Sequence, residues 1–216
     1  MDAYHSFTPA DGHGLPHDPI KAIVAPRPIG WISSIDRAGM INLAPYSYFN
    51  LFSHKPAILI FGSEGCKDTV RNVSETGEFV FNLATEDFAD ALNRTSLPHA
   101  ADVNEFAAAG LGMADSETVS VPRVANIAAA MECKLVSVQE LTDASGRTIG
   151  SHLVIGEVMR VHIAKACLAD GLFDIVRARS IARCGYRGDY IVVENTFEML
   201  RPTRNDSIRD VGHSKG

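Results

Sequence analysis

The sequence predicts a mainly β protein, a β-barrel with a few short helices. Residues 131–135 alternate apolar with charged side chains, which is the period of a strand with one face in water. Glycine and proline residues separate short elements about every ten residues, as in β-rich domains. With 216 residues, 46% of them apolar and 21% charged, the chain has enough apolar material for a buried core and does not have the composition of a disordered protein.

The strands are expected in the following order. Residues 29–35 form a β-rich run, the turn signal Asp36-Arg37-Ala38-Gly39 follows, and residues 40–43 resume the run, so we predict a hairpin. Further strands are expected at residues 57–61, 78–83 and 131–135. Residues 151–163 predict a longer strand, in which Gly156 marks a bulge or bend of the kind that barrels use.

The helices are expected to be short. Asp68, Thr85 and Asp102 are candidate N-cap residues, because their side chains can accept hydrogen bonds from the first free amides of a helix. Gly77 and Gly110 are the expected ends of the first and third of these helices.

Charge and hydropathy exclude several classes of function. The formal net charge is −6, so the chain as a whole repels nucleic acid and anionic membrane surfaces. No apolar run approaches the roughly 18 residues of a transmembrane helix. Residues 1–19 have the pattern of neither a secretory nor a mitochondrial signal, and we therefore expect a cytoplasmic protein.

The domain organisation is expected to be simple. Residues 1–19 resemble an N-terminal arm, residues 20–202 the folded domain and residues 203–216 a polar tail, because neither end has a periodic apolar pattern. The four cysteines form no CxxC pair, so reduced structural thiols are expected. His13 and His17 have a spacing compatible with metal binding but no third ligand, and we predict no metal site.

The strongest local signal for chemistry is the segment Gly62-Ser63-Glu64-Gly65-Cys66-Lys67-Asp68-Thr69, which leaves a strand and enters a helix. Free amides at a helix start, the Lys67 ammonium and the Thr69 hydroxyl together favour a phosphate monoester. The segment lacks the pattern of a Walker loop, so a nucleoside triphosphatase is disfavoured. A surface turn with a solvated lysine remains the alternative interpretation.

Two further segments are candidates for ligand binding. Residues 42–50 interleave hydroxyls, amides and aromatic rings without charge, which suits a planar ligand, although the local pattern favours an ordinary strand and loop with aromatics in the core. His152 opens the long strand where a turn meets a sheet edge, a position accessible to a ligand, but a lone histidine is more often structural.

Taken in order, the motifs resemble those of the flavin reductase-like family of FMN-binding split-barrel proteins. The first half of the match comprises Arg27-Pro28-Ile29-Gly30-Trp31-Ile32-Ser33-Ser34, residues 42–50 with Ser53 and Pro56, Lys67-Asp68-Thr69 with Asn72, and Glu78-Phe79-Val80-Phe81-Asn82. It continues through Phe106, Gly110-Leu111, Val121-Pro122, Glu132-Cys133, Gly150-Ser151-His152, Gly156-Glu157-Val158, Arg183, Tyr190 and residues 197–202. The resemblance covers nearly the whole expected domain.

The resemblance implies a six-stranded Greek-key split barrel that forms a homodimer and holds FMN near the subunit interface. It implies that Lys67, Asp68 and Thr69 hold the FMN phosphate with help from Ser47 and Asn50. Tyr48, Phe49 and Asn82 are implied to flank the ring system, and Arg27 to reach the site from its loop. His152 matches the histidine of the family's Gly-Asp-His motif on the nicotinamide side of the flavin, with Ser151 in place of the usual aspartate.

The expected function is that of an NAD(P)H-dependent flavin reductase, with His152 as the candidate catalytic residue, FMN as cofactor, NADH or NADPH as co-substrate and a monooxygenase as a possible partner. No protein nucleophile is needed, because hydride passes directly between the two cofactors. A non-catalytic FMN carrier is the first alternative. The second is a pyridoxamine-phosphate-oxidase-like enzyme, which would need another basic cluster for the phosphate of its amine substrate.

Overall fold

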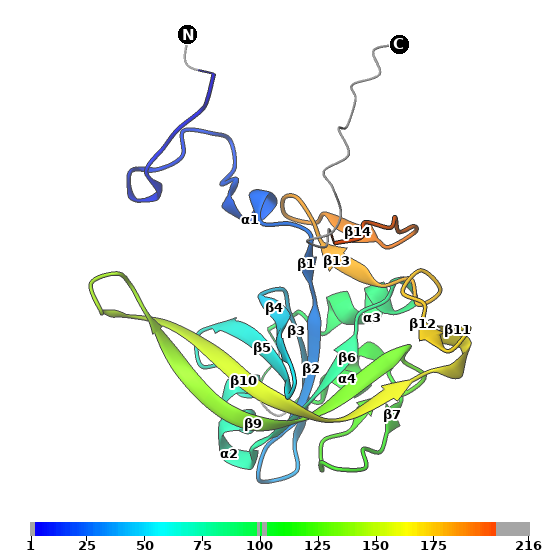
Figure 1. Cartoon of the computed structure of the whole chain (residues 1–216). Helices are drawn as coiled ribbons and strands as arrows, with labels where there is room; N and C mark the ends of the chain where they lie inside the picture. The colour runs from blue at the N-terminus through cyan, green and yellow to red at the C-terminus, as the bar shows by residue number, and fades with distance from the viewer. Residues whose placement is uncertain (1–2, 99, 101–102, 202–216) are drawn as a thin grey trace, which may run out of the picture.

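The computed structural model describes residues 3–98, 100 and 103–201 and contains one large antiparallel sheet. Its seven strands follow the order β3-β2-β6-β9-β10-β5-β4 (Figure 1). They are β2 (Gly30–Ile35), β3 (Ile41–Tyr46), β4 (Phe49–His54), β5 (Ala57–Glu64), β6 (Glu78–Leu83), β9 (Ala129–Thr142) and β10 (Thr148–Ile163). The prediction of a mainly β fold is confirmed.

The sheet curls into a partly closed barrel because of one short connection. β3 and β4 lie at opposite edges of the sheet, yet only Ser47 and Tyr48 separate them in sequence. The two edges must therefore meet, and the carbonyl of Tyr48 accepts a hydrogen bond of 2.7 Å from the amide of Gly62 in β5. The seventh strand is β4, which lies outside the runs expected from the sequence.

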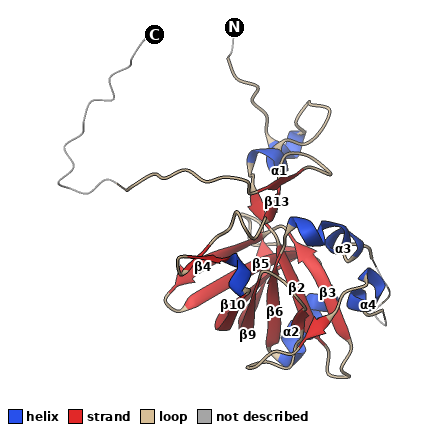
Figure 2. Ribbon diagram, turned by 90° about the vertical axis from the view of Figure 1, so that its right-hand side faces the viewer, coloured by secondary structure: helices blue, strands red, loops and turns tan. Residues whose placement is uncertain are grey.

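Three α-helices cover the barrel: α2 (Asp68–Thr76), α3 (Ala89–Arg94) and α4 (Glu105–Ala109). Figure 2 shows α3 and α4 beside β3 and α2 at the lower end of the sheet. Trp31 and Ile32 are neighbours on β2 with opposite faces, and both are completely buried, because α3 and α4 cover one face while the barrel interior covers the other. α2 contributes Val70 and Val73 to the interior cluster.

The remaining elements are short. They are η1 (Pro9–Asp11), α1 (Ile20–Ile23), β1 (Arg27–Pro28), η2 (Glu86–Phe88), β7 (Met113–Ala114), β8 (Arg123–Val124), η3 (Lys165–Cys167), β11 (Leu168–Ala169), β12 (Leu172–Phe173), β13 (Ile181–Arg183) and β14 (Tyr190–Val192). β1, β13 and β14 form a small second sheet that joins α1 to the barrel (Figure 1). Among the described helices, none has the length and apolar character of a membrane span.

Each predicted strand is present, and several are longer than the sequence pattern indicates. β9 and β10 extend as a hairpin beyond the barrel, to a turn in which Asp143 accepts the amides of Ser145 and Arg147. The bulge at Gly156 is confirmed by a register shift between Ile155 and Gly156. A Cβ at Gly156 would lie 2.3 Å from the ring of Phe79, so the close packing of that ring requires glycine.

The predicted C-terminal ends of the helices agree with the structure better than the predicted N-cap residues do. Gly77 and Gly110 close α2 and α4 with the expected left-handed backbone. The N-cap position of α2 is Lys67, and Asp68 is the first helical residue, so the prediction of Asp68 as the cap is wrong. Thr85 occupies the N-cap position of η2 without a capping hydrogen bond. Asn104 caps α4, whereas the predicted cap Asp102 lies outside the described residues.

The predicted domain boundaries remain predictions. Residues 1–2 of the expected arm and the whole expected tail, 203–216, lie outside the described residues. The described part of the arm leads away from the barrel (Figure 1). All four cysteines are free thiols, as expected for reduced structural residues.

Candidate functional site

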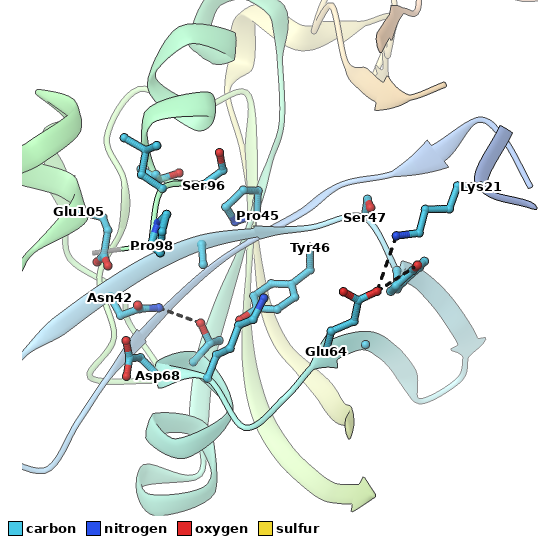
Figure 3. A pocket seen from close by; sticks show the side chains of 17 residues that line it. Lys21, Asn42, Pro45, Tyr46, Ser47, Glu64, Asp68, Ser96, Pro98 and Glu105 are labelled. Atoms are coloured by element: carbon cyan, nitrogen blue, oxygen red, sulfur yellow. Dashed lines mark hydrogen bonds and ion pairs between the residues drawn. The ribbon is translucent and has the colours of Figure 1, made fainter. Parts of the chain in front are cut away.

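A pocket of about 440 Å³, here called the polar pocket, opens where β3, the end of β5 and the start of α2 meet the loop after α3 (Figure 3). It is lined by Lys21, Asn42, Ala44, Pro45, Tyr46, Ser47, Tyr48, Gly62, Glu64, Lys67, Asp68, Thr69, Thr95, Ser96, Leu97, Pro98 and Glu105. The predicted cofactor residues Ser47, Tyr48, Lys67, Asp68 and Thr69 therefore come together in one cavity.

The start of α2 brings groups of the kind that favour anions to this pocket. A turn at Gly65, which has a left-handed φ of 90°, brings the chain from β5 to Lys67. No side chain caps the helix, so its first amides are left without side-chain acceptors. Lys67 is exposed and makes no ion pair within the described part of the chain. Asp68 is paired with Arg71, which neutralises the carboxylate nearest to the helix start.

Thr69 is the buried donor of the pocket, and its neighbours fix its position. The Asn42 side chain donates a hydrogen bond of 2.8 Å to Thr69 Oγ1. Tyr46 lies beside them in the wall, and burial raises the pKa of its phenol while hydrogen bonds with Thr69 and Ser63 lower it. The charges of Asp68 and Glu105, which also line the pocket, raise the pKa of this phenol further, so Tyr46 is neutral beside the two hydroxyl groups.

A second cavity, here called the apolar pocket, adjoins the polar pocket and has a volume of about 320 Å³. It is lined by Val24, Pro26, Arg27, Pro28, Ser47, Tyr48, Phe49, Asn50, Phe52, Ile60, Gly62 and Leu153. The ring of Phe49 is stacked on Phe81 at 4.7 Å between centroids, which fixes one wall. Ser47, Tyr48 and Gly62 line both pockets, so the two cavities meet at the β3–β4 turn.

A third cavity of about 540 Å³, here called the cationic pocket, lies between α1 and the β13–β14 hairpin. It is lined by His17, Asp18, Lys21, Arg27, Arg183, Gly185, Tyr186 and Arg187. Lys21 also lines the polar pocket, where its ammonium lies 3.7 Å from Glu64 (Figure 3). The hydrogen bond with Tyr48 and the charge of Glu64 raise the pKa of Lys21.

Of the other predicted cofactor residues, three line the apolar pocket and one lines none of the three cavities. Arg27, Phe49 and Asn50 line the apolar pocket, next to Ser47 and Tyr48. Asn82 lines none of the three cavities, because its side-chain amide is hydrogen-bonded in the core. Its Nδ2 donates to the carbonyl of Trp31 and the hydroxyl of Ser33, and its Oδ1 accepts from the amide of Val124.

His152 also lines none of these cavities, although its neighbour Leu153 does. Alternation along β10 turns His152 to the same side as the fully buried Val154, toward the barrel interior. Its Nδ1 is buried and has no hydrogen-bond partner. The structure thus places the imidazole behind the strand whose opposite face forms the apolar pocket.

Several pocket residues received no role from the sequence. Lys21 and Arg187 are solitary cations in turn-rich segments, where local sequence offers no signal. Arg183 belongs to the family motifs but reaches the site only through its pairing with β1. Asn42 and Tyr46 lie in the uncharged 42–50 segment, whose composition did indicate a ligand-lining strand.

Comparison with known proteins gives consistent results. A family model described as "Flavin reductase like domain" matches residues 24–178. An uncharacterized protein of Aquifex aeolicus is 33% identical over 179 residues, which is 80% of this chain and 87% of that protein.

Solved structures show the same architecture. The crystal structure of nitrilotriacetate monooxygenase component B from Bacillus cereus matches with a TM-score of 0.82 and 29% identity, and the match covers 92% of this chain and 100% of that chain. A protein from Shewanella frigidimarina with a split barrel domain matches with a TM-score of 0.75 and 23% identity over 85% of this chain and 90% of that chain. The predicted split barrel is therefore confirmed as the fold.

Proposed function

The chain belongs to the flavin reductase-like family, and we propose that it is an FMN-dependent oxidoreductase that takes hydride from NADH or NADPH. The observation that carries this proposal is the junction of the polar and apolar pockets at Ser47 and Tyr48. A polar cavity with cationic and amide donors that opens directly into an apolar cavity matches a molecule with a phosphate at one end and a planar ring at the other.

The residues of the polar pocket fit the phosphate of FMN. A phosphate dianion needs several donors and a positive charge, and the start of α2 supplies both through its uncapped amides and the Lys67 ammonium. Thr69, oriented by Asn42, supplies a buried hydroxyl. Asp68 takes part through its position at the helix start, since its carboxylate is bound to Arg71.

The residues of the apolar pocket fit the flavin ring. Tyr48, Phe49 and Leu153 cover apolar surface, while Asn50 and Arg27 offer polar groups at the rim. Bound FMN would supply the ring that accepts the hydride. The chain itself orients that ring, excludes water from one face of it and places the Arg27 charge at its edge, where it stabilises developing negative charge. His152 would act from behind the strand, as a positioning residue.

The proposal is tested with purified protein under anaerobic conditions. We expect the protein to bind FMN with quenching of its fluorescence, and to lose the visible flavin absorbance when NADH or NADPH is added. If the protein stays yellow with both nucleotides and is bleached only by dithionite, it is a flavin carrier and the enzymatic part of the proposal is wrong. If it binds no FMN at all, the whole proposal is wrong.

We also propose that the protein acts in the cytoplasm as a homodimer and serves a monooxygenase partner. Support for the dimer comes from exposed apolar side chains on β4 and β10, among them Leu51, Met159 and Val161. Support for the partner comes from the similarity to a protein named as a monooxygenase component. Light scattering of wild type and of Val161→Asp tests the dimer, which should dissociate in the variant.

A further inference from the structure

The cationic pocket contains more positive charge than the protein neutralises. Arg27, Arg183 and Arg187 line it together with Lys21, whose ammonium lies 3.7 Å from Glu64. Among the lining residues that the structure describes, the only carboxylate is that of Asp18. Asp18 already accepts a hydrogen bond of 2.9 Å from the amide of Ile20. The electrostatic potential in this cavity is therefore positive, and an anion is its natural occupant.

Two of these cations are held against each other. Arg27 in β1 and Arg183 in β13 are direct partners in the antiparallel register of the small sheet. Like charges at directly opposed positions destabilise a sheet. An anion between or beside the two guanidinium groups would compensate for this repulsion. Arg27 is only 8% exposed, so water offers little screening for its part of this repulsion.

The hydrogen bonds of the two arginines leave their charge uncompensated. Arg27 donates through Nη1 to the carbonyls of Lys21 and Val24, the latter at 2.6 Å. Arg183 donates to the hydroxyl of Tyr190 at 3.0 Å and stacks on that ring at 4.7 Å. The Nε atoms of both arginines are buried and have no partner. No carboxylate forms an ion pair with Arg27, Arg183 or Arg187 in the residues that the structure describes.

The position of the pocket indicates which anion it receives. Arg27 lines both the cationic and the apolar pocket, so the two cavities share a wall. A molecule with a planar ring in the apolar pocket and phosphates some distance along its chain would reach the guanidinium groups. The polar pocket supplies a separate phosphate site at the start of α2, so the cationic pocket is a second one.

We propose that the cationic pocket, through Arg183 and Arg187, binds the phosphate groups of the nicotinamide dinucleotide that reduces the flavin, while Arg27 forms the wall that it shares with the apolar pocket. The proposal rests on the proposed function, because it is the flavin in the apolar pocket that gives the nicotinamide ring its place. It adds a recognition site for the reductant on α1 and the β13–β14 hairpin, in a different cavity from the start of α2.

The test is calorimetric titration of the FMN-loaded protein with ADP, 2′,5′-ADP and pyridoxamine 5′-phosphate. We expect both adenine nucleotides to bind, and Arg183→Gln and Arg187→Gln each to weaken that binding about tenfold or more, the effect of a charged hydrogen bond. FMN affinity should not change in either variant. Arg37→Gln, which removes the same charge from the exposed β2–β3 turn, serves as the matched control and should bind like wild type.

The outcomes separate this proposal from the flavin assignment. Tighter binding of 2′,5′-ADP than of ADP supports the 2′-phosphate of NADPH as the bound group, and tighter binding of ADP supports recognition of the pyrophosphate, which 2′,5′-ADP lacks. Wild-type affinities in both arginine variants overturn the proposal, as does binding of pyridoxamine 5′-phosphate alone. If the protein binds FAD more tightly than FMN and the difference is lost in Arg187→Gln, the pocket belongs to the flavin, and this result also overturns the proposal. If no FMN binds, the same titrations on flavin-free protein still report the site.

Discussion

Two clusters of charge in this protein, each with one buried charged residue, are arranged in opposite ways. Glu132 in β9 is completely buried, yet every direction around its carboxylate is filled. Oε1 accepts the amide of Glu117 at 2.8 Å and contacts His162 Nε2 at 2.6 Å. Oε2 accepts the amide of Thr118 at 2.6 Å and also its hydroxyl. This cluster ties the loop before β8 to the two long strands.

The arginines of the cationic pocket show the reverse pattern. Arg27 and Arg183 oppose each other, and each keeps a buried Nε without an acceptor. The comparison teaches that burial alone does not mark a site, because Glu132 and Arg27 are both buried. A charged group whose donors or acceptors are all hydrogen-bonded within the chain stabilises the fold, whereas a charged group with an unpaired donor is available to a ligand.

The largest effect should follow from breaking the filled cluster. Glu132→Ala leaves the amides of Glu117 and Thr118 and the imidazole of His162 without their acceptor, and should lower the free energy of unfolding by about 3–5 kcal/mol. Urea denaturation measures this. Glu140→Ala, at an exposed position of the same strand, should change it by less than about 0.5 kcal/mol. Equal effects of the two substitutions would contradict the structural role of Glu132.

The same cluster predicts sensitivity to acid. Burial raises the pKa of Glu132, but the hydrogen bonds from Thr118, His162 and Glu117 outweigh it and bring the value to about 2, from 4.5. Because the folded pKa is the lower one, this stabilisation is complete above pH 4.5 and is lost as the pH falls toward 2. The loss should amount to about 3 kcal/mol. Denaturation at a series of pH values should show a flatter profile for Glu132→Gln, and an equally steep profile would count against the assignment.

A substitution in the proposed phosphate site at Lys67 should change the affinity for FMN rather than the free energy of unfolding. Lys67→Ala removes the exposed ammonium at the start of α2 and should weaken FMN by about 1.5–3 kcal/mol, or roughly 10–100-fold. Fluorescence titration measures the dissociation constant. The flavin-free variant should unfold at the wild-type urea concentration. Lys165→Ala, another exposed lysine, should leave both quantities unchanged. A loss of stability in Lys67→Ala without a change in FMN affinity would contradict the binding role that we assign to Lys67.

The sequence could predict the strand-turn-helix arrangement at Lys67 because all of its parts are local. The strand, the turn at Gly65 and the helix start follow one another within a few residues, so their order alone places an ammonium beside free amides. The cationic pocket could not be predicted in this way. Arg27 and Arg183 meet only through the pairing of β1 with β13, a contact between distant parts of the chain.

Side-chain direction marks the second limit of prediction from sequence. Asn82 and His152 were correctly placed on strands, but the side of the strand that each faces depends on register and on how the sheet curls. The structure turns Asn82 into the core, where Trp31, Ser33 and Val124 satisfy it, and turns His152 toward the interior. The full length of β9 was missed for the same reason, since its outer half pairs with β10 outside the barrel and shows no simple alternation.

Glu78 offers the smallest and most discriminating test, because it is an intermediate case. Its Oε2 accepts the amide and the hydroxyl of Ser120 at 2.8 and 2.7 Å, while Lys134 lies 3.4 Å from Oε1 at a partly exposed position. Ser120→Ala removes one of these bonds where water can replace it, so the free energy of unfolding should fall by about 0.5–1 kcal/mol. Thr118→Ala removes the equivalent hydroxyl from the fully buried Glu132, where water has less access than at Glu78, and should cost more in the same urea titration. If the two substitutions cost the same, access of water does not set the strength of these clusters, and the contrast between filled and open charges loses its physical basis.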